Sequence, residues 1–484
     1  MSPTSTFLFL TVLGALSSPT DSFRVPSAPY VPSPIRFTVP QQTSQAIPAS
    51  LSRRPVQFAL QADAFAPADA SAAAAPAPTT TTGLPTSTFN LIKACVGAGV
   101  LSLPAGVAAF SSSPAALVPA SALMVTLGGL SAYSFNTIGK LSQHTNATSL
   151  STIWESTVSP SAWPVSLACF LTPLGAALSY SIILGDATTS LAAAAGFSLA
   201  RPYAILGLAG TALYRLCRLS DLSALAPVSI VGVMGILATT VFQGVRAFGP
   251  AYKAGGAFFS QLSSPPSFAP GVTFLSPQTL VLVSMAATAY LSHFNAPDFK
   301  RGLTDSTPGR FKKLTALGFG ATSIISLLMM SFGFLTFGSS TLGVVLNNYA
   351  PSDLGAVVCR LLMAISIVGS YPFVFGGMKR GYFDLVKKEM TPARDRTFTR
   401  VALACITGLA LALKDAGFVC SFNGAVCGSA IIYIFPSLMF LRSGMEGRRG
   451  EAGFNKFMIA LGALFGVAGG AVSVMQSFFP AILG

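Results

Sequence analysis

One hydrophobic run, at residues 90–110 with the sequence NLIKACVGAGVLSLPAGVAAF, carries glycine at its centre. The run is long enough to cross a bilayer, but Gly97 and Gly99, with Ala98 between them, give the backbone freedom to leave the helical conformation. In hydrocarbon an unpaired backbone group is costly, so a non-helical segment survives only where it faces a cavity or buried protein. The run therefore predicts a broken membrane helix whose free amides and carbonyls bind a transported solute.

Hydrophobic runs of membrane-spanning length recur along the rest of the chain. Of its 484 residues, 52% are hydrophobic and only 9% are charged, a composition unlike that of ordinary soluble domains. A spanning helix needs about 20 apolar residues. We predict eleven such spans, at residues 87–110, 115–138, 163–186, 202–217, 223–246, 278–298, 314–338, 353–378, 398–414, 417–441 and 455–480. The fold class expected is an all-α, multi-pass membrane protein in a lipid bilayer.

Positive charge falls mainly on alternate loops between these predicted spans. If the segment before the first span is cytoplasmic, the inner loops hold nineteen Lys and Arg residues. The outer loops then hold only Arg201, Arg246, Lys253 and Lys414. Cytoplasmic loops collect Lys and Arg, so this asymmetry indicates the orientation of the chain. The net charge of +14 is therefore a topology signal, and nucleic-acid binding is not indicated.

The first 85 residues have a different composition from the rest. They are rich in Pro, Ser, Thr and Ala, including the run ASAAAAPAPTTTT, and cannot bury enough apolar surface to fold alone. Residues 7–16 have the length of a signal-peptide core, and the Arg-containing segment after them is typical of a transit peptide. The join DSFRVPS, with Phe23, resembles the signal-plus-transit leaders of algae with complex plastids. Three interpretations stay open. The segment could direct the protein to the plastid envelope, or to a vacuolar, endomembrane or plasma membrane, or it could be a disordered cytoplasmic tail with no targeting role.

The remaining residues, 86–484, form the predicted transmembrane domain, and their chemistry argues against an enzyme. Seven cysteines lie within predicted spans without a CxxC pair, so neither a zinc site nor a disulfide framework is indicated. The chain has two histidines, His144 and His293, and no acid stands near either in a catalytic arrangement. We expect no enzymatic activity, no metal and no cofactor other than a coupling ion.

A second interrupted span lies five spans after the first. Residues 278–298 include the polar residues Ser292, His293 and Asn295, followed by Pro297. Ionisable groups at membrane depth are expensive, so His293 is either functional or a cap at the inner end of the span. Breaks in spans one and six predict a five-plus-five inverted repeat with the binding site at its interface.

An ordered set of motifs gives the chain a family resemblance. The sequence NLIKACVGAGVLSLPAG resembles the first helix of the amino acid/auxin permease family, which includes the sodium-coupled neutral and the vacuolar amino acid transporters. The sequence HFNAPDFKRGL is similar to that family's sixth helix. The later motifs SFGFLTFG, YPFVFGGMKR and IFPSLMFL keep the family's order and spacing. Together the motifs cover residues 86–482.

The resemblance implies a transporter of eleven helices with the leucine-transporter type of inverted repeat, moving amino acids with protons or sodium. An amino acid is a zwitterion, so amides starting one half-helix suit its carboxylate, and carbonyls ending another suit its ammonium group. Ser181 on the third span is a further candidate for selecting the side chain. The expected substrate-binding residues are Val96, Gly97, Ala98, Gly99, Tyr180, Tyr290, Leu291, Ser292, His293, Asn295 and Asn423.

Ion coupling is where the chain departs from its sodium-coupled relatives. By motif register, their helix-eight hydroxyl is kept at Ser370, but their uncharged polar residue on helix one is replaced by Lys93. An ammonium group there would repel sodium. One interpretation is that Lys93 stands in for the cation and transport is proton-coupled through Lys93 or His293. The other is that Lys93 extends to the inner interface and has no role.

Two alternatives to a proton-coupled transporter stay open. One is a sodium-coupled symporter, and the other is an amino acid sensor that binds without net flux. The low-complexity N-terminus offers no ordered partner-binding segment, and no obligate protein partner is indicated.

Overall fold

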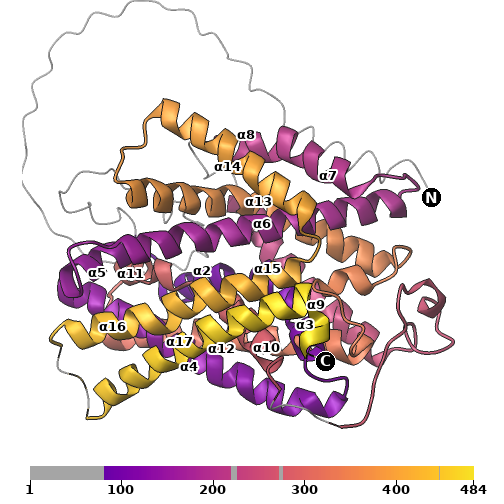
Figure 1. Cartoon of the computed structure of the whole chain (residues 1–484), viewed down its shortest axis with the longest axis horizontal. Helices are drawn as coiled ribbons and strands as arrows, with labels where there is room; N and C mark the ends of the chain where they lie inside the picture. The colour runs from indigo at the N-terminus through magenta and orange to yellow at the C-terminus, as the bar shows by residue number, and fades with distance from the viewer. Residues whose placement is uncertain (1–80, 220–225, 272–275, 446, 448, 484) are drawn as a thin grey trace, which may run out of the picture. The chain divides into compact units, whose positions relative to one another are not determined.

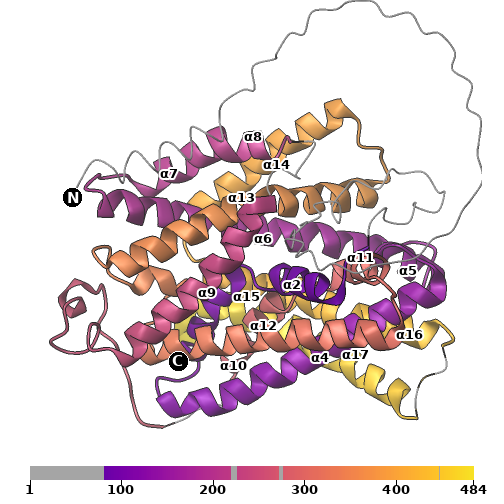
Figure 2. The same cartoon turned by 180° about the vertical axis from the view of Figure 1, so that it is seen from behind.

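Helices make up most of the described chain (Figures 1 and 2). The computed structural model describes residues 81–219, 226–271, 276–445, 447 and 449–483. The long helices are α4 (Leu117–Thr145), α6 (Trp163–Ala194), α9 (Ala226–Phe248), α12 (Pro308–Phe337), α13 (Leu354–Val386), α14 (Pro392–Ala412) and α17 (Glu451–Phe478). The shorter helices are α2 (Leu84–Cys95), α3 (Leu103–Ala108), α5 (Leu150–Thr157), α7 (Arg201–Leu208), α8 (Tyr214–Leu216), α10 (Thr279–Ala289), α11 (Ala296–Gly302), α15 (Ala416–Asn423), α16 (Phe435–Arg442) and α18 (Pro480–Leu483). The targeting interpretation of the first 80 residues lies outside the described part.

Most of the predicted spans coincide with helices that could cross a membrane. Among the described residues, seven helical stretches are long and apolar enough, and the bent pair α2–α3 makes an eighth. The seven are Pro114–Thr145, Trp163–Ala194, Ile230–Phe248, Pro308–Phe337, Leu354–Val386, Ala416–Arg442 and Glu451–Phe478. The chain is therefore an integral, multi-pass membrane protein.

At the three other predicted spans the helices are too short or too charged to meet that criterion. Helices α7 and α8 are joined by a π-helical turn over Ala209–Leu213 and together end at Leu216. Helix α10 stops at Ala289 because the sixth span is broken there. Helix α14 carries four charged residues in its first half, Arg394, Asp395, Arg396 and Arg400. The count of eleven spans stays a prediction.

The order of helix lengths occurs twice along the chain. Helix α4 has 29 residues and α12 has 30, while α6 has 32 and α13 has 33. Both α6 and α13 contain an internal proline, Pro173 and Pro372 respectively. These two helices pack side by side (Figures 1 and 2), and a Cβ on Gly381 would lie 2.8 Å from the Cys169 carbonyl oxygen. The recurrence is the pattern expected of two copies of one helical unit.

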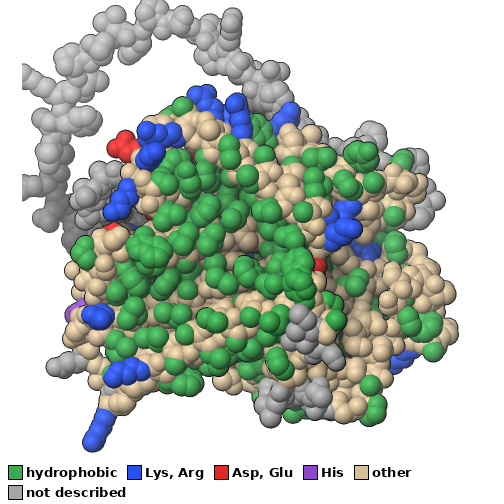
Figure 3. All heavy atoms as spheres, in the orientation of Figure 1, with side chains coloured by type: hydrophobic (Ala, Val, Ile, Leu, Met, Phe, Trp, Pro, Cys, Tyr) green, Lys and Arg blue, Asp and Glu red, His purple; other side chains and the backbone are tan. Residues whose placement is uncertain are grey.

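The exterior of the bundle is apolar. Large hydrophobic side chains are strongly exposed, including Val467 at 77% and Val118 at 75%. Figure 3 shows hydrophobic side chains over most of the visible face, with Lys and Arg side chains toward its edges. A soluble monomer rarely exposes so large an apolar surface. Lipid in contact with this surface removes it from water, and the charged edges lie where headgroups would be.

Buried charges hold the loops at the end of the bundle that we predict to be outer. Asp353, fully buried, accepts hydrogen bonds from Arg246 Nη2 at 2.6 Å and from the Tyr252 hydroxyl at 3.0 Å. Arg360 donates to the carbonyl oxygen of Leu346 at 2.8 Å. Because buried charges are costly unless they are paired or hydrogen-bonded, these contacts fix the segment between α12 and α13. That segment borders the cavity described below.

Candidate functional site

The first broken helix changes direction at Val96 and Gly97. Helix α2 ends at Cys95, a 3₁₀ turn (Ala98–Ser102) follows, and the two halves of the pair make an angle of 49°. Gly97 has φ −110° and ψ −162°, an extended conformation open to any residue. Its small size matters instead, since a Cβ there would lie 3.3 Å from the Tyr180 hydroxyl oxygen. The glycine therefore sits in a tight space beside Tyr180, and its φ angle does not need the backbone freedom expected from sequence.

The break frees backbone groups of both signs. The Gly97 amide donates to the Cys95 carbonyl oxygen at 3.0 Å, and the 3₁₀ turn begins one residue later. The first amides of any helix lack partners within that helix, and in this 3₁₀ turn they are the amides of Ala98 and Gly99. The last carbonyls of α2 carry partial negative charge, whereas the first amides of the 3₁₀ turn carry partial positive charge. Lys93 lies in the final turn of α2.

The second break separates α10 from α11. Helix α10 ends at Ala289, and a 3₁₀ turn (His293–Asn295) precedes α11. Tyr290 and His293 are fully buried. The Tyr290 hydroxyl donates to the Met124 carbonyl oxygen at 3.1 Å, and His293 Nε2 lies 2.9 Å from the Ser131 carbonyl oxygen. Both side chains therefore contact carbonyl oxygens of α4.

The fold brings the two breaks into contact. Cys95 Sγ and Ser292 Oγ are 3.1 Å apart, and a Cβ on Gly99 would lie 3.1 Å from Thr288 Cγ2. Thr288 Oγ1 in turn donates to the Cys420 carbonyl oxygen on α15 at 2.6 Å. Sequence reasoning missed Cys95, Thr288 and Cys420, because none of them is unusual in a membrane helix. Only their position beside a predicted break could have indicated them.

The other predicted side chains divide into two groups. Tyr180 lies beside Gly97, with its ring centre 6.5 Å from that of Tyr371 on α13. Ser181, one residue on, hydrogen-bonds with the Tyr371 hydroxyl at 3.0 Å. Asn423 donates to the Thr172 carbonyl oxygen on α6 at 3.2 Å, so its amide joins two helices. Tyr180, with Tyr371 packed against it, therefore lies beside the first break. Asn423 instead lies between α15 and α6.

The remaining predicted residues, Val96, Leu291 and Asn295, belong to the non-helical segments or 3₁₀ turns at the two breaks. Val96 and Leu291 are buried, and Asn295 is half-buried at the end of the 3₁₀ turn before α11.

Of the residues predicted for ion coupling, Lys93 on α2 lies near α13, the helix that carries Ser370. Lys93 Nζ lies 5.8 Å from the centre of the Phe373 ring on α13. Phe373 is three residues from Ser370, so the two share one face of that helix. The Lys93 ammonium group therefore lies near the α13 surface that also carries Ser370, and its role in ion coupling stays a prediction.

At the inner end, the two broken helices are tied together by backbone hydrogen bonds. The Thr82 amide, just before α2, donates to the Gly302 carbonyl oxygen at 2.8 Å. The Thr304 amide donates back to the Thr82 carbonyl oxygen at 3.0 Å. This parallel bridge between Thr82 and Leu303 joins the start of the first broken helix to the end of the second. The helix that follows this bridge, α2, begins at Leu84, and the domain boundary at residue 86 stays a prediction.

Broken helices that meet inside a multi-pass bundle are a recurring feature of membrane transporters. The chain belongs to the transmembrane amino acid transporter protein family, whose pattern matches residues 80–479. It is accordingly a transporter by family and not an enzyme.

The chain is similar to named transporters from animals and plants. It is 23% identical over 414 residues to the Danio rerio "Putative sodium-coupled neutral amino acid transporter 11", covering 82% of this chain and 87% of that protein. It is 22% identical over 389 residues to amino acid transporter AVT6B of Arabidopsis thaliana, covering 74% and 81%.

A solved structure shows a similar fold. The Eremococcus coleocola manganese transporter, with an aromatic bis-isothiourea substituted compound bound, superposes with a TM-score of 0.52 at 11% identity. The match covers 81% of this chain and 87% of that one. Likeness at this identity concerns the fold alone, which is of the leucine-transporter type.

Proposed function

We propose that this chain is a secondary active transporter that moves amino acids by alternating access and couples their movement to protons. The membership of the family supports the class of substrate. The recurrence of helix lengths supports the predicted five-plus-five inverted repeat, in which one unit moves against the other. The bridge between Thr82 and Leu303 joins the two broken helices at the end that we predict to be inner, and in this proposal it would have to open when the substrate leaves inward.

The substrate would bind between the two breaks through its charged backbone groups. Amides at the start of the 3₁₀ turn after Gly97 suit the carboxylate, because a helix start carries partial positive charge. The carbonyls that end α10, around Leu291, suit the ammonium group. Tyr180 and Tyr371 would then border the substrate's side chain.

The position of Lys93 is the observation that carries proton coupling. Its ammonium group approaches the same face of α13 that carries Ser370, the residue kept from the sodium-coupled pattern. Two unit charges about 4 Å apart repel by about 4 kcal/mol at an effective dielectric constant near 20. A sodium ion beside Lys93 would be disfavoured, whereas a lysine that gains and loses a proton can supply the charge that sodium supplies elsewhere.

The decisive experiment is uptake of a radiolabelled amino acid mixture into proteoliposomes, with proton and sodium gradients imposed in turn. We expect wild-type uptake to follow the proton gradient alone. Lys93→Asn should abolish the response to the proton gradient, because the protonatable group is gone. Lys313→Asn is the matched control, since Lys313 is an exposed lysine at the inner end of α12 and its loss removes the same charge.

The other outcomes are informative as well. Sodium-driven uptake by the wild type would replace the proton mechanism with sodium symport, as the name of the Danio rerio relative suggests for that protein. Equal ion dependence in the wild type and Lys93→Asn would remove Lys93 from the mechanism. Binding without flux under either gradient would favour a sensor.

A further inference from the structure

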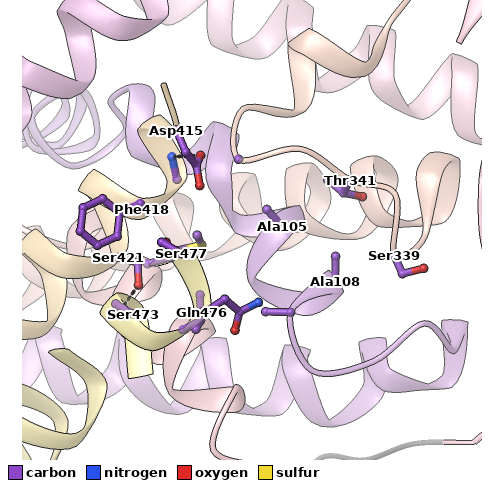
Figure 4. A pocket seen from close by; sticks show the side chains of 15 residues that line it. Ala105, Ala108, Ser339, Thr341, Asp415, Phe418, Ser421, Ser473, Gln476 and Ser477 are labelled. Atoms are coloured by element: carbon purple, nitrogen blue, oxygen red, sulfur yellow. Dashed lines mark hydrogen bonds between the residues drawn. The ribbon is translucent and has the colours of Figure 1, made fainter. Parts of the chain in front are cut away.

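A cavity of about 190 Å³ lies between the outer halves of the two broken helices. One water needs about 10–15 Å³ on the same measure, so the space admits a small solute. Figure 4 shows its lining, which comes from α3, α10, α15, α17 and the segment after α12. The polar side chains that line it are Ser339, Thr341, Asp415, Ser421, Ser473, Gln476 and Ser477.

The floor of this cavity lies about one helical turn from the breaks. Met285 lines the cavity three residues before Thr288, and Ser421 lines it one residue after Cys420. The hydrogen bond from Thr288 Oγ1 to the Cys420 carbonyl oxygen, at 2.6 Å, therefore separates the cavity from the broken segments. Thr288 also lies against Gly99. Breaking the hydrogen bond between Thr288 and Cys420 would therefore free a side chain that packs on the first break.

The cavity is chemically two-sided. Asp415 is the one charged residue in its lining, at the start of α15, where its Oδ1 accepts a hydrogen bond from the Gly417 amide at 2.8 Å. The Gly343 loop packs so closely that an added Cβ would lie 1.9 Å from Asp415 Oδ1. Partial desolvation raises the pKa of the Asp415 carboxyl, so a cation beside it would offset that penalty.

Other parts of the cavity lining are apolar. They are formed by Val281 and Met285 of α10, Phe418 of α15, Ala105 and Ala108 of α3, and Ala109 just after α3. A bare metal ion would gain nothing from this surface, whereas a solute with both an ammonium group and an aliphatic part would contact both sides. The hydroxyl groups of Ser421 and Ser473 hydrogen-bond with each other, and Ser473 Oγ also donates to the Gly469 carbonyl oxygen at 2.7 Å, so these two polar groups are already paired with protein atoms.

We propose that this cavity is an outer waiting site, in which the transported amino acid rests with its ammonium group on Asp415 before it passes Thr288. This inference rests on the proposed function. It assigns Asp415 as a substrate-binding residue outside the central site, and Thr288 as a residue of the gate between the two sites.

The test variant is Asp415→Asn. Asparagine caps a helix start as well as aspartate does, so this change keeps the α15 cap and removes only the charge. We expect the KM of uptake to rise about 10-fold, the loss of one hydrogen bond to a charged group, with the maximal rate little changed. Lys414→Gln is the matched control, because Lys414 is exposed beside Asp415 but does not line the cavity.

A second measurement does not depend on the rate of transport. Ser477→Cys places a thiol in the cavity lining, where a membrane-impermeant thiol reagent should modify it. The amino acid should slow this labelling, and adding Asp415→Asn should raise the concentration needed for protection. An unchanged KM in Asp415→Asn together with no protection, in a wild type that transports, would overturn the waiting site and leave the proposed function standing. A wild type that neither binds nor moves any amino acid would instead refute the proposed function itself.

Discussion

The two breaks expose backbone by different means. At the first, Gly97 has no side chain, and the space beside it is taken by the Tyr180 hydroxyl. At the second, Tyr290 and His293 have large polar side chains, but these bind carbonyl oxygens of α4. The first segment has no side chain at Gly97, whereas the second has large side chains that are held against α4. The two segments meet inside the bundle, where Cys95 contacts Ser292.

This difference separates residues that touch a ligand from residues that hold a segment in place. A polar side chain at a break invites a direct role, as we expected of His293. Its Nε2 lies 2.9 Å from the Ser131 carbonyl oxygen and its ring centre is 5.8 Å from those of Phe135 and Phe319. These contacts favour a positioning role, and the direct role stays a prediction. Gly97 at the first break has no side chain that could bind a neighbouring helix. A larger residue there would therefore enter the proposed substrate site beside Tyr180. Three predictions test this contrast.

The largest effect is expected from Gly97→Val. The new side chain would meet the Tyr180 hydroxyl, and overpacking of this kind costs about 1–3 kcal/mol. Since that space adjoins the proposed substrate site, we expect uptake to fall by up to about 100-fold while the protein still folds. The control is Gly129→Val on α4, where an added Cβ meets nothing within 4 Å. Near-normal uptake in Gly97→Val would show that the first break is not part of the site.

A smaller and different effect is expected from His293→Gln. Glutamine can still donate to the Ser131 carbonyl oxygen, but the ring contacts are lost, so the free energy of unfolding should fall by about 1–2 kcal/mol. Proton-driven uptake should persist. The control is His144→Gln, because His144 is exposed in the last turn of α4. Loss of proton coupling with normal binding would make His293 the proton carrier and break the contrast between the two segments.

The smallest effect is expected from Tyr290→Phe. This change removes a buried hydroxyl that hydrogen-bonds with Met124 and Ser323, and such bonds contribute about 1 kcal/mol within a membrane. The thermal unfolding midpoint in detergent should fall slightly, and the KM should not change. Tyr203→Phe is the control, since Tyr203 is 71% exposed. A raised KM would indicate that Tyr290 contacts the substrate.

Much of the fold could be predicted because its signals are local. Span length, loop charge and the glycines at positions 97 and 99 can be recognised in the sequence alone. The bilayer, rather than contacts with distant residues, sets the span length and the loop charge. The three spans that the structure does not support by length and composition, near Tyr214, Tyr290 and Arg400, are those with interrupted or charged sequences. There the local signal is weak, and packing against neighbours decides what forms.

The site was predicted less completely than the fold, because side-chain direction is not a local property. The sequence marked both breaks, and the fold places them in contact through Cys95 and Ser292. It did not indicate that Asn423 joins α15 to α6, or that Thr288 bridges α10 and α15. These contacts join residues more than a hundred positions apart, so no pattern in either segment encodes them.

By itself, the sequence determined that this chain spans a membrane many times, that two of its spans are interrupted, and that it carries the family's motifs in order. Hydrocarbon imposes those features on each segment separately, because every backbone group in the bilayer must find a partner. Only the tertiary structure decided which polar side chains face the breaks and which anchor them, and that a cavity lies beyond Thr288. Those outcomes depend on which helices pack together, since a side chain at a helix surface binds whatever its neighbour presents.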